Sequence, residues 1–166
     1  MTVFIISLII IINFILQSTV ISYFSIFGVV PNTSLIIIVA IALLKGKKVG
    51  STTGLLIGLL QDIVFSSVIG VNAFIYFFIG YLMGMAEDKL SKENILLPVI
   101  MSIITTIGYH FFYFLFMFFL NYDISFSIFF KQIVIIEMIY NSLLSIFLFK
   151  LFSKIFVMPS ITFGKK

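Results

Sequence analysis

Long apolar runs that alternate with lysine clusters constrain this sequence more than any other feature. Six runs follow one another along the 166 residues, at about 3–24, 28–44, 49–66, 70–86, 95–120 and 126–149. A helix needs about 20 apolar residues to cross the hydrocarbon core of a bilayer. The runs therefore predict an all-α integral membrane protein, with one transmembrane domain of six helices over residues 1–166 and no soluble domain.

The composition excludes the common soluble classes. Hydrophobic residues make up 62% of the chain and charged residues 10%, and the mean hydropathy is +1.31, whereas soluble domains are about 25% charged. A globular soluble domain, a nucleic-acid-binding protein and a disordered chain are excluded, because each would expose this apolar surface to water. Cysteine is absent, which also excludes disulfides and thiolate metal sites.

The lysines predict the orientation of the bundle. All ten basic residues are lysines. Nine of them lie in 45–48, in the loop 87–94 and in the tail after residue 149, which share one side if all six runs cross the membrane. Only Lys131 falls on the other side. Because cytoplasmic loops carry the excess of Lys and Arg, both termini are expected to be cytoplasmic. The runs within 31–85 are short, so a re-entrant segment there is the alternative.

Glycine recurs at four-residue spacing in the third run, and a shorter pair follows in the fourth. These residues are Gly46, Gly50, Gly54 and Gly58, and then Gly80 and Gly84. Four-residue spacing keeps side chains on one face of a helix, and small residues there let two helices approach closely in lipid. The series predicts packing within the bundle or, alternatively, a face for a partner protein, for a second copy of the chain or for a ligand.

Polar residues inside the runs are the other candidate sites. Gln61 and Asp62 come near the end of the third run, where an unpaired charge costs at least ~2.5 kcal/mol. They predict either a polar, proton-sensitive pocket or a helix end that is hydrated or hydrogen-bonded to backbone.

Two polar stripes at four-residue spacing lie in the last two runs. They are Ser102, Thr106 and His110 in the fifth run, and Glu137, Asn141 and Ser145 in the sixth. Such stripes on neighbouring helices can hydrogen-bond across their interface, and Lys131, His110 or Asn141 is the expected partner of Glu137. The single histidine disfavours a metal site. The sequence contains no catalytic motif and no phosphate loop, so neither enzymatic activity nor a cofactor is predicted.

The middle third of the chain carries a series of motifs that resembles a known family. Pro31-Asn32 opens a run, and Gly58-Leu59-Leu60-Gln61-Asp62, Gly70-Val71-Asn72-Ala73-Phe74 and Gly80-Tyr81-Leu82-Met83-Gly84 follow. This series resembles the rod shape-determining protein MreD family of bacteria over about residues 31–84. Pro31 and Gly70 are typical of turns or helix starts, and Asn72 adds a polar residue within a run. Asn32 stands where the family often has Asp, so no role for a charge carries over there.

The resemblance implies a role rather than a reaction. It implies a non-catalytic, multi-pass protein of the bacterial cytoplasmic membrane that serves cell elongation and peptidoglycan synthesis. The implied direct partner is MreC, a single-span protein, with MreB, RodA and penicillin-binding protein 2 as indirect partners. The family is similar in fold to the vitamin-binding S-components of energy-coupling-factor transporters, which gives the alternative function. Those subunits typically dock through small residues on the first helix, whereas Val3–Tyr23 contains no Gly or Ala.

Overall fold

The computed structural model describes residues 2–25, 27–87, 96–122 and 133–156. Within these ranges the chain forms α-helices and one short 3-10 helix, and no β-strand. The elements are α1 (Thr2–Ser18), η1 (Ile21–Phe24), α2 (Thr33–Phe65), α3 (Val71–Gly84), α4 (Leu96–Phe119) and α6 (Ile135–Phe156). The predicted all-α class is confirmed. Of the described helices, α4 and α6 are long and apolar enough to cross a membrane by length and composition.

α2 is divided by a sharp kink at Gly46. The backbone there has φ 80° and ψ 178°, outside the helical region, and glycine adopts a positive φ without the steric cost of a Cβ atom. The chain then folds back on itself, since a Cβ placed on Gly50 would lie 2.5 Å from Cβ of Ala42. The kink thus makes two packed helical segments of α2, at the lysine cluster that separates the second and third apolar runs.

The first half of α2 begins later than the run that predicts it. Asn32 is the N-cap, and its side chain accepts a hydrogen bond from the backbone N–H of Leu35 at 3.0 Å. Pro31 precedes this cap and disfavours helical backbone in the residue before it. The helix therefore starts at Thr33 rather than at residue 28. From Thr33 to the kink it is ~20 Å long, which is shorter than the ~30 Å hydrocarbon core.

The ends of the first and last helices also differ from the predicted runs. α1 stops at Ser18 and is followed by η1, so the run 3–24 is not one continuous helix. α6 continues past residue 149 to Phe156 and carries Lys150 and Lys154 in its last two turns. Both lysines are exposed. Lysine can lay its aliphatic stem along an apolar surface and keep its ammonium group in water. The two charges therefore do not end α6 at residue 149.

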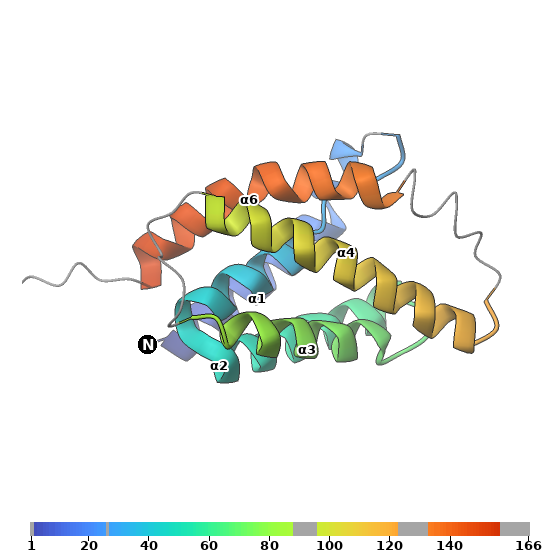
Figure 1. Cartoon of the computed structure of the whole chain (residues 1–166), viewed down its shortest axis with the longest axis horizontal. Coiled ribbons are helices and arrows are strands. Elements are labelled where there is room, and N and C mark those ends of the chain that lie inside the picture. The colour runs from blue at the N-terminus through green and yellow to red at the C-terminus, as the bar shows by residue number, and fades with distance from the viewer. Residues whose placement is uncertain (1, 26, 88–95, 123–132, 157–166) are drawn as a thin grey trace, which may run out of the picture.

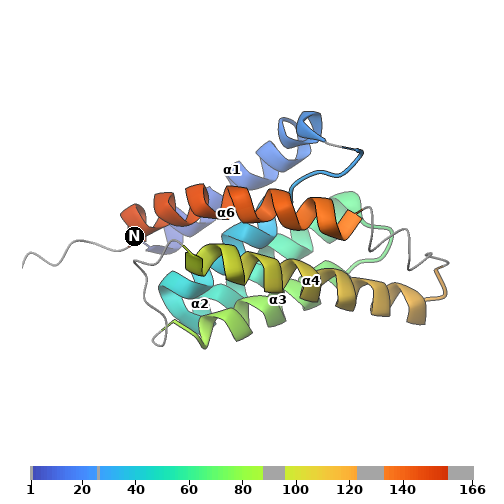
Figure 2. The ribbon, with the colours of Figure 1, turned by 45° about the horizontal axis from the view of Figure 1, so that its top comes forward.

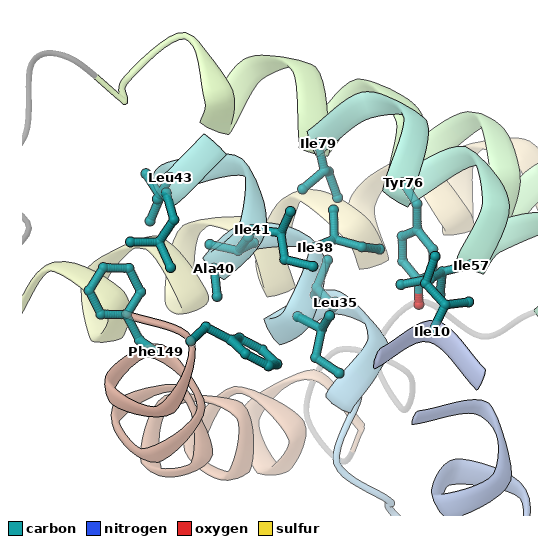
Figure 3. Packing of buried hydrophobic residues seen from close by; sticks show 14 of the residues in the cluster. Ile10, Leu35, Ile38, Ala40, Ile41, Leu43, Ile57, Tyr76, Ile79 and Phe149 are labelled. Atoms are coloured by element: carbon teal, nitrogen blue, oxygen red, sulfur yellow. The ribbon is translucent and has the colours of Figure 1, made fainter. Parts of the chain in front are cut away.

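The first half of α2 lies at the centre of the bundle, and every residue from Thr33 to Leu44 is buried. α3 packs along the second half of α2, α6 packs against α4, and α1 lies on α2 (Figures 1 and 2). Ile38 and Ile41 of the central segment lie beside Ile79 of α3, and Leu35 and Phe149 of α6 belong to the same buried cluster (Figure 3).

The outer faces of the helices are apolar. Val3, Phe118 and Phe147 are 78%, 67% and 74% exposed, and large apolar side chains cover the outside of α1, α4 and α6. Such a surface is suited to lipid rather than to water.

The lysines of the described residues gather at one end of the bundle, called here the lysine end. Lys45, Lys47 and Lys48 surround the kink, and Nζ of Lys45 donates a hydrogen bond of 3.2 Å to the carbonyl of Phe156. This contact brings the last turn of α6, with its lysines, to the kink. The start of α1 and the end of α3 lie at the same end (Figure 1).

Candidate functional site

Asp62 lies at the end of α2 and caps the start of α3. Its side chain is fully buried. Oδ2 accepts hydrogen bonds from the backbone N–H groups of Gly70 and Ala73, both at 2.9 Å. Oδ1 accepts from the backbone N–H of Asn72 at 3.2 Å and from its Nδ2 at 2.8 Å. Gly70 is the N-cap residue of α3 and has no side chain to bind these amides, so Asp62 supplies the cap from the preceding helix.

Asn72 extends the Asp62 cluster to α4. Its Oδ1 accepts a hydrogen bond of 2.7 Å from the hydroxyl of Tyr109. The Tyr109 ring is stacked on the ring of Tyr76, with 5.2 Å between the ring centroids. The Tyr76 hydroxyl in turn bonds the side chain of Asn32, at 2.9 Å from Nδ2 and 3.1 Å from Oδ1. These contacts join both ends of α2 to α3 and α4.

The two polar stripes on α4 and α6 face each other. Nε2 of His110 lies 2.8 Å from Oε2 of Glu137. One turn away, Nδ2 of Asn141 donates to Oγ1 of Thr106 at 3.0 Å and also to Oε1 of Glu137 at 3.3 Å. All four side chains are buried. Ser102 and Ser145, a further turn along, are buried and line the same small cavity.

Asn141 joins the stripes to the rest of the buried polar groups. Its Oδ1 accepts a hydrogen bond of 2.9 Å from the backbone N–H of Asn32. Buried polar contacts therefore run from Asp62 through α3 and α4 to the start of α2 and on to α6. We call these side chains the polar network: Asn32, Asp62, Asn72, Tyr76, Thr106, Tyr109, His110, Glu137 and Asn141.

A second polar cluster attaches α1 to the start of α2. Nδ2 of Asn13 donates to Oγ of Ser34 at 2.9 Å, and the Thr33 hydroxyl lies 2.7 Å from Oδ1 of Asn13. Thr33 also contacts the side-chain oxygen of Gln17. Gln61 lies here rather than with Asp62, and it lines a cavity of about 10 Å³ beside Asn13 and Ser34. That volume is close to the space of one water molecule.

The glycine series lies between the second half of α2 and α3. A Cβ on Gly50 would lie 2.7 Å from the carbonyl oxygen of Gly80, and one on Gly58 would lie 2.5 Å from the backbone nitrogen of Ala73. Gly54 faces the carbonyl group of Tyr76 in the same way. Gly46 and Gly84 meet at the lysine end, since a Cβ on Gly84 would lie 2.6 Å from the carbonyl carbon of Gly46. All six predicted glycines are buried, so α3 covers this face.

Several of these residues were not singled out from the sequence. Tyr76 and Tyr109 are among many aromatic residues in apolar runs, and nothing in their spacing distinguishes them. Asn13 and Gln17 do carry a signal, because they are polar, four residues apart and within a span.

The arrangement of the network indicates positioning rather than chemistry. Its polar atoms bind one another, and no group of three or more His, Cys, Asp or Glu residues in the described ranges could hold a metal ion. The bundle is thus a helical protein with an apolar exterior and a buried polar network that joins its helices, as expected of a multi-helix membrane protein.

The family match extends over nearly the whole chain. Residues 1–155 match the family described as rod shape-determining protein MreD, so the chain belongs to the MreD family. This confirms the resemblance and makes the chain a membrane protein with a role in rod shape, from a family of structural proteins that act in a complex with MreC and MreB. The chain matches no curated protein and no solved structure.

Proposed function

We propose that this protein is a non-catalytic membrane scaffold of the bacterial cell-elongation machinery. Its direct partner is a single-span protein of the MreC type, through which it acts on MreB and on the peptidoglycan synthases RodA and penicillin-binding protein 2. The match to the MreD family over residues 1–155 carries this proposal.

The buried contacts support a scaffold role. Asp62, His110 and Glu137 are the ionisable side chains most suited to chemistry, yet each is buried and engaged with another helix. Hydrogen bonds between helices are a main source of association in lipid, where apolar burial contributes little. A bundle held in this way can present a partner with one fixed surface.

We also propose that all six runs cross the cytoplasmic membrane and that both termini are cytoplasmic. The lysine end supports this orientation, because Lys45, Lys47 and Lys48 share it with the last turns of α6. Cytoplasmic segments carry the excess of lysine. The sixth run begins within 123–132, which lies outside the described residues, as do Lys131 and the loop lysines Lys89 and Lys92.

The alternative function is the substrate-binding S-component of a vitamin transporter. The two cavities that border Gln61 and Ser102 measure about 10 Å³ each, which is room for one water molecule. A vitamin would require a much larger polar pocket, and the hollow of about 370 Å³ between α1 and α6 is lined mainly by apolar side chains. The scaffold is therefore the function that we prefer.

Depletion and purification separate the two functions. Depletion of a scaffold should round the cells and disperse the elongation synthases, while vitamin uptake stays unchanged. Purification in mild detergent should recover the MreC-type protein. Purification of a tagged copy from cells that also contain an untagged copy should show whether two copies of the chain associate. Recovery of an ATPase-linked transporter module, or of a bound vitamin, would instead establish the S-component function.

A further inference from the structure

A lateral groove separates α1 from α6 on the outside of the bundle. The groove has a volume of about 370 Å³, and the first half of α2 forms its floor through Thr33 and Ile37. Its walls are mainly branched apolar side chains. Among them are Ile5, Ile9 and Ile12 from α1, and Leu151 and Ile155 from α6.

The lining of the groove is suited to a flexible chain rather than to a helix. Among the residues that the structure describes, no glycine, alanine or serine lines the groove, whereas helices that pack closely in lipid meet at small residues. The interface between α2 and α3 in the same protein does have such small residues, because its glycines lie against the backbone of the facing helix. An acyl chain can follow the irregular surface between bulky side chains without a close backbone approach.

The length of the groove corresponds to one leaflet of a bilayer. It extends along α1 from Ile5 to Leu16, which is ~16 Å of helix. Half of the hydrocarbon core is ~15 Å thick. One acyl chain that enters at the lysine end would therefore reach the deep part of the groove, which Asn13, Leu16 and Thr33 line.

The mouth of the groove is positively charged. Lys154 is exposed and is adjacent in the chain to Ile155, which lines the wall. Lys45 lies at the same place, since its Nζ is 3.2 Å from the carbonyl oxygen of Phe156 and 5.3 Å from the centre of that ring. Neither α1 nor the last turn of α6 contributes an acidic residue here. The carboxylate of Glu87, after α3, lies against the kink of α2, so Lys154 is the cation beside the groove wall itself. The lysine charges complement a phosphate group.

We propose that this groove binds one acyl chain of an anionic phospholipid from the leaflet at the lysine end, with the lipid phosphate beside Lys154 and Lys45. The bound lipid would fill the space between α1 and α6 and join them to the central segment of α2. This inference goes beyond the scaffold function and does not depend on the MreC-type partner.

The chain contains no tryptophan, so a single introduced tryptophan reports on its own surroundings. Leu151→Trp places the reporter on the groove wall, where Leu151 is 52% exposed. Ile100→Trp is the matched control, because Ile100 is 50% exposed, near the lysine end, and on α4 away from the groove. The full chain is reconstituted in two sets of phosphatidylcholine vesicles. One set contains brominated phosphatidylglycerol and the other contains the same mole fraction of brominated phosphatidylcholine. The quenching of tryptophan fluorescence by the brominated lipid is measured in each.

We expect brominated phosphatidylglycerol to compete for the site next to Trp at position 151 about fivefold better than brominated phosphatidylcholine, since one lysine near an anionic headgroup contributes about that factor. At position 100 the two lipids should quench equally. Two further variants are made in the Leu151→Trp background. Lys154→Gln should reduce the preference for phosphatidylglycerol over phosphatidylcholine. Lys48→Gln, which removes an equal charge at the kink, should preserve that preference. Ile9→Phe, which fills the groove, should abolish it.

Two results would overturn the proposal. Equal quenching by both lipids at position 151 would mean that the groove holds only bulk lipid. Shielding from both lipids that increases with the protein-to-lipid ratio would assign the groove to a second copy of the chain. Leu8→Trp, on the opposite wall, provides a second reporter if Leu151→Trp does not fold.

Discussion

Asp62 at the end of α2 accepts a hydrogen bond of 2.9 Å from the backbone N–H of Ala73 in the first turn of α3. With its bonds to Gly70 and Asn72, the same carboxylate satisfies three backbone amides that the α3 helix cannot satisfy itself. The negative charge also lies at the positive end of the α3 dipole. Asp62 is thus the link that fixes the turn between two antiparallel helices.

Replacement of Asp62 should destabilise the protein even when the change is small. Asp62→Asn keeps one oxygen but turns an NH2 group towards backbone donors, so we expect a loss of about 1–3 kcal/mol. Asp62→Leu should cost more, because the backbone N–H groups of Gly70, Asn72 and Ala73 then lose the acceptor that they share. Thermal unfolding in detergent, followed by size-exclusion chromatography, measures both. Wild-type stability in Asp62→Leu would show that the cap is dispensable.

The sequence predicted Asp62 as a site but left its two interpretations open. The four-residue glycine spacing and the Gln61-Asp62 pair could be identified from residue types alone. The partners of Asp62 could not, because they depend on how α3 begins at Gly70 and folds back along α2. The structure combines parts of both interpretations, since Asp62 is at a helix end and bound to backbone, yet is fully buried rather than hydrated.

The pairing of α4 with α6 could be predicted from the sequence more fully than the partners of Asp62. Three polar residues at four-residue spacing on each run predicted an interhelical interface, and His110, Thr106 and Asn141 do meet residues of the other stripe. The kink at Gly46 was indicated only as a break between runs. Its sharp reversal requires a positive φ, which no hydropathy pattern encodes. The late start of α2 likewise depends on the Asn32 cap.

Close packing at Gly54 should make even a methyl group harmful. A Cβ there would lie 2.6 Å from the carbonyl carbon of Tyr76, so Gly54→Ala must push α3 away from α2. We expect a loss of about 1–3 kcal/mol or more, read as a lower melting temperature in detergent. Gly108→Ala is the matched control, because a Cβ on Gly108 meets nothing within 4 Å. That change should be neutral or should stabilise α4 by up to about 1 kcal/mol. Equal effects of Gly54→Ala and Gly108→Ala would show that close packing of Gly54 against α3 does not contribute to stability.

The proposed topology can be tested without interfering native thiols, because the chain has no cysteine. Lys48→Cys places a thiol at the lysine end, and Ser67→Cys places one at the opposite end, and both positions are exposed. A membrane-impermeant maleimide should label Ser67→Cys in intact cells and Lys48→Cys only after lysis. The reverse pattern would place the lysine end outside. Labelling of both positions in intact cells would contradict the assignment of the third run, which lies between them, as a span.

The buried pair of His110 and Glu137 should be more sensitive to the loss of one partner than to the loss of both. Removing a single member leaves the other buried without its 2.8 Å contact, which costs about 3–5 kcal/mol when the remaining group is charged. Replacing both by apolar residues removes that penalty. We therefore expect His110→Leu with Glu137→Met to be more stable than either single variant, with a coupling energy of about 0.5–3 kcal/mol. Asn141 retains its bond to Thr106 in the double variant, so the interface keeps one of its polar contacts. Additive losses in the double-mutant cycle would show that the two side chains contribute independently and that their contact does not hold α4 against α6.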